Sequence, residues 1–301
     1  MKIPFETTIA TSYRFAFRNI LSIFGIGWAP ALALFVISAG LVMMLLPGIS
    51  DLIAQGDKVD ATQVAAFLPQ AGLAILVWIL VLLVAAAMIY AGVIRKALGI
   101  LPGPVYFYFP LDSQVWRIVG AFLLLWALSW GVLIVVGGAI TAIAVFVGHY
   151  SQPGAGVVTG ILVTIAMLAA YYALVRVQFF LPVIVVAENH ISLARSWALG
   201  RENFWRILGI TLIMVLPLGF ASSTITNSFM QMYLTPIVPG MPSTQILSNF
   251  GHAMVSIAPI YVVVQLLYVI FVLAFTAIAG TAAYRFVTGG ESIAPPPPPK
   301  V

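Results

Sequence analysis

The chain has 301 residues, of which 62% are hydrophobic and only 7% are charged. A soluble domain carries roughly 25% charged residues, so 13 basic and 8 acidic side chains are too few for a water-exposed surface of this size. The composition excludes the soluble classes and indicates a polytopic membrane protein, and the lack of cysteine in the sequence excludes disulfides, thiolate metal sites and cysteine nucleophiles.

The segment before the first apolar stretch is expected to be an amphipathic helix in the membrane interface. Ile9, Tyr13 and Ala16 recur at a spacing of three or four residues, while Arg14 and Arg18 share another face. A helix of this kind points its arginines toward lipid phosphates and keeps its aromatic side chains at the acyl boundary. The alternative is that the helix only docks on the bundle and positions the span that follows.

Six apolar stretches come next, and each is long enough for the helix of about 20 residues that crosses a bilayer. The final run, Ile207 to Tyr284, is too long for one span, and the segment 235–243, which contains three prolines and a glycine, divides it into two. We place the spans at residues 22–46, 71–94, 118–148, 155–187, 207–230 and 255–284. The predicted fold is all-α: one membrane domain over residues 1–287, built from three hairpins with cytoplasmic lead-in helices, and a disordered Pro-rich tail at 288–301.

The middle hairpin is longer than a bilayer requires. Residues 118–148 reach about 46 Å at about 1.5 Å per residue, against a hydrocarbon core of about 30 Å. Arg176 in the following span is expected near the inner boundary, where its side chain can extend to the phosphates. The apolar residues 177–187, which include Pro182, are expected to protrude or bend there and to be covered by the interfacial helices.

A second amphipathic segment precedes the fifth span and resembles the first in sequence. Ser12–Ile26 aligns with Ser196–Ile210, with a serine, an aromatic residue, an asparagine and Ile-x-Gly-Ile in register. Trp116–Gly120 matches Trp205–Gly209 as a fainter third copy, although the residues before it do not match. The pattern predicts three repeated units, each a lead-in followed by a hairpin. The competing explanation is that any amphipathic helix entering a bilayer has this pattern. The candidate lipid or partner interface consists of six lead-in residues: Arg14, Arg18, Arg195, Trp197, Arg201 and Arg206.

The stretch from the fourth to the fifth span carries a family resemblance. Its residues are Arg176, Leu181–Glu188, Ser192–Leu199 and Asn203–Gly209. They resemble the membrane domain fused to some bacterial glycerophosphodiester phosphodiesterases, together with its stand-alone, largely uncharacterised six-span relatives. The resemblance implies a six-helix integral domain without a defined molecular role. Because membrane segments account for almost the whole chain, we expect no phosphodiesterase barrel in it and do not carry that activity over.

The cations indicate the orientation of the spans. In the six-span arrangement, twelve of the 13 basic residues lie on one side and only Lys58 lies on the other. This asymmetry follows the positive-inside rule and predicts a multi-pass protein of the bacterial cytoplasmic (inner) membrane with both termini cytoplasmic. Topology thereby explains the basic excess, and no nucleic-acid-binding face is expected.

No motif in the sequence indicates catalysis or a cofactor. The three histidines are scattered over loops without metal-ligand spacing, and the sequence has neither a Gly-rich phosphate loop nor a G-x-S-x-G elbow. We therefore expect a protein that is not an enzyme and that needs no metal or cofactor.

Two functions fit the sequence. The favoured hypothesis is a membrane scaffold or lipid-associated accessory protein that acts through its cytoplasmic interfacial helices. The alternative is a permease or channel for a small solute or lipid, because Arg176, Gln178 and Gln265 form a candidate intramembrane polar site. A continuous polar cavity around Gln265 would favour transport, and a sealed apolar bundle would oppose it.

Membrane lipids are the expected partners of this chain. The proline tail could in addition dock on the aromatic groove of a cytoplasmic protein, since a polyproline helix is preformed for such grooves. The sequence leaves the oligomeric state open.

Overall fold

The computed structural model describes residues 2–55, 61–150, 152–233 and 243–289. Over these residues the chain is all-helical. Its helices are α1 (Phe5–Arg18), α2 (Ile20–Gln55), α3 (Ala61–Leu98), α4 (Ser113–Tyr150), α5 (Gln152–Glu188), α6 (Leu193–Gly200), α7 (Phe204–Tyr233) and α8 (Ser243–Val287). Within the described ranges, 6 helices, namely α2 to α5, α7 and α8, are long and apolar enough to cross a membrane. The predicted all-α class with six spans is therefore confirmed.

Each spanning helix extends beyond the predicted span at both ends. Helices α2 and α3, for example, continue through Pro47 and Pro69, because a helix need not end where its apolar stretch ends. Helix α4 ends at Tyr150, and α5 begins at Gln152. The predicted break at 235–243 falls almost entirely on 234–242, which lies outside the described residues, and so does most of the predicted tail, at 290–301.

The six long helices form three antiparallel hairpins whose contacts repeat in a cyclic order. The pairs are α2 with α3, α4 with α5, and α7 with α8. The second helices of the three hairpins, α3, α5 and α8, contact one another at the centre. Each first helix also packs on the second helix of another hairpin: α4 on α3, α7 on α5, and α2 on α8. Three units with equivalent surfaces would produce this arrangement.

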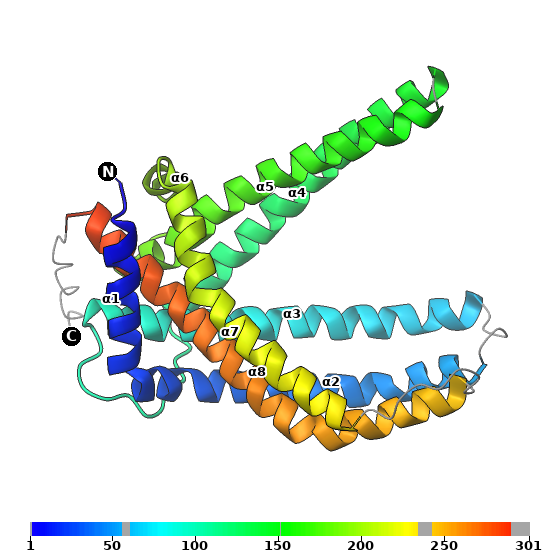
Figure 1. Ribbon diagram of the computed structural model, residues 1–301, viewed down its shortest axis with the longest axis horizontal. Coiled ribbons are helices and arrows are strands. Elements are labelled where there is room, and N and C mark those ends of the chain that lie inside the picture. Colours follow the sequence, from blue (N-terminus) through cyan, green and yellow to red (C-terminus); the bar gives the residue numbers. More distant parts are fainter. Residues whose placement is uncertain (1, 56–60, 151, 234–242, 290–301) are drawn as a thin grey trace.

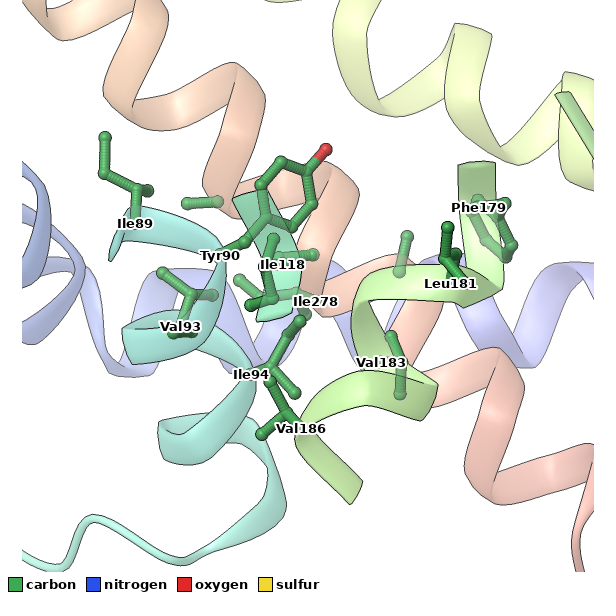
Figure 2. Packing of buried hydrophobic residues seen from close by; sticks show 14 of the residues in the cluster. Ile89, Tyr90, Val93, Ile94, Ile118, Phe179, Leu181, Val183, Val186 and Ile278 are labelled. Carbon is green, nitrogen blue, oxygen red and sulfur yellow. The ribbon is translucent and has the colours of Figure 1, made fainter. Parts of the chain in front are cut away.

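The core lies where α3, α4, α5 and α8 meet. Figure 2 shows Ile94 of α3, Ile118 of α4, Val186 of α5 and Ile278 of α8 packed together, and all four are buried. Helix α8 approaches α5 closely at Gly280, where a Cβ would lie 2.8 Å from a backbone carbonyl of α5. The apolar contacts of these central helices hold together the end of the bundle that carries α1 and α6.

The C-terminal half of α5 has a different environment from the one predicted. Most of residues 177–187 belong to this core, where α5 contacts α3 and α8, and α6 also packs on α5 at Val177. The helix continues through Pro182 to its end at Glu188. The excess length of the middle hairpin is therefore used to fill the centre of the protein, because apolar side chains beyond the bilayer are stabilised only when they are buried.

The α4/α5 hairpin diverges from the other two hairpins along its length. In Figure 1 the two green helices rise toward the upper right, while α2 and α3 run horizontally to the right and α7 and α8 slope toward the lower right. The far half of this hairpin exposes large apolar side chains such as Val135 and Phe146. In a bilayer, lipid chains would cover these side chains.

Candidate functional site

One end of the bundle gathers the segments that lead into the three hairpins. Figure 1 shows α1, α6 and the α3–α4 connection at the same end as both chain termini. Helix α1 packs on α8, and α6 packs on α5. The connection, residues 99–112, is bonded to Arg95 and Lys96 at the end of α3. Each lead-in therefore rests on the second helix of another hairpin, and we call this surface the lead-in face.

Helix α1 is held by small polar side chains and exposes its cations. Its buried face consists of Thr8, Ser12 and Ala16. The hydroxyl groups of Thr8 and Ser12 each donate to a backbone carbonyl one turn earlier, at 2.7 Å, so their burial leaves no hydroxyl unpaired. Arg14 and Arg18 are exposed, as an interfacial helix requires. Phe17 beside them is 65% exposed.

Helix α6 uses the equivalent positions to dock on α5. The Ser196 hydroxyl donates to the Val177 carbonyl at 2.6 Å, and Gly200 lies against the backbone of Arg176, where a Cβ would approach the carbonyl oxygen to 2.9 Å. Arg195, Trp197 and Arg201 remain exposed. The neighbouring Trp205, at the start of α7, is 79% exposed.

Arg206 has a different role from the exposed arginines. Its Nη1 donates to the Ile3 carbonyl at 2.7 Å, and the Ile3 N–H donates to the Asn203 side-chain oxygen at 2.8 Å. Ile3 is fully buried between these contacts. Arg206 thus fastens the N-terminal segment to the start of α7 instead of facing the membrane surface.

The two segments aligned in sequence make matching hydrogen bonds. The side-chain amide of Asn19 donates to the Phe15 carbonyl at 2.9 Å, and that of Asn203 donates to the Leu199 carbonyl at 3.3 Å. In both segments the backbone carbonyl of the asparagine accepts a hydrogen bond from the N–H of the isoleucine four residues later. Each asparagine therefore stabilises the same bend between a lead-in helix and its span.

The third lead-in, residues 99–112, was not recognised from sequence. Arg95 holds it in place by donating to Tyr108, Asp112 and Gln114. Burial raises the pKa of Asp112, but the hydrogen bond and charge of Arg95 and the Val115 N–H outweigh it, so the pKa lies below its ordinary value. The carboxylate therefore stays charged and keeps this ion pair at neutral pH.

The same segment exposes a run of aromatic side chains. Tyr106 is 71% exposed, and Phe107 and Phe109 are exposed beside it. The Val105 N–H donates to the Ser22 hydroxyl at 3.2 Å, which ties the run to the first span. The signal in the sequence was the aromatic stretch Val105–Phe109 after Arg95 and Lys96, which lacks helical periodicity and so does not resemble the other two lead-ins.

The three residues of the predicted intramembrane polar site differ in their surroundings. Arg176 is buried and bonded to Tyr172 and Trp197. Gln178 is exposed on α5, and Gln265 is half-buried on α8. The expectation that Arg176 extends toward the phosphates is wrong for this conformation, because Trp197 covers its side chain.

Two adjoining cavities open beside α4 and α5. The α4/α5/α6 groove has a volume of about 740 Å³ and is lined by apolar side chains, including Leu128, Met167 and Trp197. A second cavity of about 460 Å³ lies between α3, α4, α5 and α8, where Gln178 and Tyr268 are among its polar side chains. Gln265 lines neither of them.

The described residues contain no group of three or more His, Asp or Glu side chains that could hold a metal ion. The comparisons with known proteins identify no relative: no protein family, curated protein or solved structure matches this chain.

Proposed function

We propose that this integral membrane protein is a non-enzymatic, lipid-associated accessory or scaffold protein that acts through its lead-in face. The observation that carries the proposal is the composition of that face. All three lead-ins present exposed aromatic side chains, and two of them also present the exposed arginines Arg14, Arg18, Arg195 and Arg201. Arginines beside aromatic rings are the side chains that bind the headgroup region of an anionic membrane.

The way in which the lead-ins are held supports a surface role for these cations. The hydrogen bonds that dock these segments on the bundle are made by Tyr13, Ser196, Asn203 and Arg206, so docking does not require the exposed arginines. Arg195 is ion-paired with Glu188 at 3.4 Å, and the charges of Arg14, Arg18 and Arg201 are left to interact with lipid headgroups or with an acidic cytoplasmic partner. Packing alone, the alternative for these helices, gives no reason for the exposed cations.

The cavities give less support to passage of a polar solute. The larger groove is almost entirely apolar, and the smaller one is bounded mainly by aliphatic and aromatic side chains despite Gln178 and Tyr268. A solute pathway at membrane depth needs polar or charged groups along it. We propose that the working surface lies at the cytoplasmic side of the bacterial inner membrane, as the positive-inside rule predicts for the cations of the lead-in face.

The test is the lipid that accompanies the protein in bilayer discs of phosphatidylcholine with a minor fraction of phosphatidylglycerol. We expect phosphatidylglycerol to be enriched around the wild type. The variant R14Q/R18Q/R195Q/R201Q should lose this enrichment severalfold, because each cation near an anionic surface contributes about 1 kcal/mol. The matched control R14K/R18K/R195K/R201K keeps the charges and should keep the enrichment.

Two outcomes would contradict the proposal. The first is a lipid composition around the protein that equals that of the bulk disc. The second is solute flux through sealed proteoliposomes that is unchanged when the four arginines are neutralised, which would identify a transporter instead.

A further inference from the structure

Arg176 is a buried cation for which the described residues supply no anion. Its side chain is 3% exposed, although it belongs to a membrane-spanning helix. Among the described residues, Arg95 forms an ion pair with Asp112, and Arg195 forms one with Glu188. The His190 ring also lies beside Glu188 and would pair with it as an imidazolium. A buried charge without a counter-ion is strongly unfavourable in a low-dielectric environment. The position therefore calls for an anionic ligand.

The groups that do contact the guanidinium are all neutral. Nη1 donates to the Tyr172 hydroxyl at 3.0 Å, and Nη2 donates to the Trp197 carbonyl at 3.2 Å. The guanidinium lies 3.8 Å from the centroid of the Trp197 ring and 5.1 Å from that of Tyr172. The Nε–H is buried and has no hydrogen-bond partner. These contacts fix the orientation of the guanidinium but leave one donor and the charge unsatisfied.

Trp197 connects this cation to the α4/α5/α6 groove. The same indole that covers the guanidinium also lines the groove, together with Val177, the residue that follows Arg176. The groove volume of about 740 Å³ is typical of a ligand site, and its lining is apolar. The Trp197 indole thus borders both an unpaired cation and an apolar groove. This combination is complementary to an amphiphile with an anionic head.

We propose that Arg176 and the groove bind one anionic glycerophospholipid, with its phosphate on the guanidinium and an acyl chain in the groove. A planar guanidinium can donate two parallel hydrogen bonds to a phosphate. The ligand carries a net negative charge, because a zwitterionic headgroup would bring an ammonium group for which no described carboxylate lies beside Arg176. A membrane supplies such lipids at high local concentration.

Trp197 moves when the lipid binds. The α6 backbone is fixed by the Ser196 hydrogen bond and by Gly200 against α5, so the helix itself stays in place. The indole is 40% exposed and can rotate away from the guanidinium about its own side-chain bonds. This rotation opens the guanidinium to the groove, and the unpaired Nε–H and a neighbouring Nη N–H can then donate to the phosphate in the guanidinium plane.

The inference deepens the proposed function, since both have lipid as the ligand, but it concerns a single desolvated site. The test is native mass spectrometry of the full chain in mild detergent, titrated with phosphatidylglycerol or phosphatidylcholine of identical acyl chains. We expect the first phosphatidylglycerol to bind about tenfold more tightly or better, as one or two charge-assisted hydrogen bonds provide. R176Q should abolish this preference, while the matched control R285Q, at an exposed position of α8 outside the lead-in face, should retain it.

Salt separates this site from the lead-in face. Exposed arginines are screened at high salt, whereas a desolvated pair is screened much less. The inference is supported if the first bound lipid is preferentially phosphatidylglycerol even in high salt and if this preference disappears in R176Q. This holds even if bilayer discs show no phosphatidylglycerol enrichment around the protein. A preference that is lost in R14Q/R18Q/R195Q/R201Q and kept in R176Q would overturn the inference and leave the proposed function standing.

Two further arms make the result independent of whether R176Q folds. A170F narrows the groove and leaves Arg176 unchanged. It should weaken the binding of the first phosphatidylglycerol at least severalfold. Unchanged binding by A170F, or equal binding of the two lipids by the wild type, would overturn the proposal. Inorganic phosphate that competes as effectively as the lipid would also overturn it, because the groove would then contribute nothing.

Discussion

A single tyrosine hydroxyl compensates for a proline inside α7. Pro217 has no N–H, so the carbonyl of Ile213, four residues earlier, loses its partner within the helix. The Tyr13 hydroxyl of α1 donates to this carbonyl at 2.8 Å. The proline thus creates a specific acceptor for α1, and this polar contact adds to the apolar packing of α1 side chains such as Phe5 and Ile9 on the core.

The first prediction concerns this hydrogen bond. Y13F should lower the free energy of unfolding by about 1 kcal/mol, the usual contribution of one such bond. In a P217A background the new N–H at position 217 can bond Ile213, so Y13F should cost much less. Thermal unfolding of the four proteins in mild detergent measures the difference. An equal cost of Y13F in both backgrounds would show that the proline is irrelevant to the contact.

Sequence could predict some residues of the lead-in face and not others. Arg14 and Arg18 follow from helical periodicity, since an arginine on the polar face of an amphipathic helix is exposed. Arg206 satisfies the same pattern, yet it bonds to Ile3, far away in the sequence. Periodicity describes one helix at a time, so it cannot identify a partner that only the tertiary fold brings near.

Among the elements, the segment 99–112 departs most from what the sequence suggested. It replaces a lead-in helix with an extended, aromatic-rich connection that packs over the start of α2. Two glycines allow the close approach: a Cβ on Gly25 would lie 2.0 Å from the Val105 carbonyl oxygen, and one on Gly92 would lie 2.6 Å from the Tyr108 ring. Its irregular backbone gives no periodic signal, which explains why the third copy of the repeat looked faint.

A glycine pair in α2 tests this packing. G25A should displace the segment 99–112 and destabilise the protein by about 1–3 kcal/mol, as overpacking does. G40A, in the same helix, is the matched control because a Cβ there meets no atom within 4 Å. Thermal unfolding in mild detergent should show a lower midpoint for G25A alone. Equal midpoints for the two variants would mean that the segment does not pack on α2 as described.

At the scale of the whole molecule, the cyclic arrangement of the hairpins explains why the cations gather at one end. The lead-ins and the adjoining ends of all six spans meet there, so residues that are distant in sequence contribute to one surface (Figure 1). Hydropathy predicted the number of spans because each long helix is apolar along most of its length. Hydropathy could not predict the cyclic order of the hairpins. Neighbouring hairpins are equally apolar, and only the shapes of their surfaces determine which hairpins pack together.

The orientation of the molecule can be tested with the natural cysteine-free chain. Q55C, at the end of α2, should react with an impermeant thiol reagent in intact cells. A198C, at an exposed position of α6, should react only after the membrane is permeabilised. Labelling is read by mass shift on a denaturing gel. The opposite pattern would place the lead-in face outside the cytoplasm and reverse the predicted topology.

The contacts of Ile3 with Asn203 and Arg206 have a consequence for biosynthesis. The ribosome releases the N-terminal segment long before α7 and α8 exist, yet these helices provide its binding surface. During translation α1 must therefore wait without its final partners, and an amphipathic helix can do so on the membrane surface, where lipid covers its apolar side. The α7/α8 hairpin then captures α1, which was made before it, so this part of the assembly is completed only after α7 and α8 have been inserted.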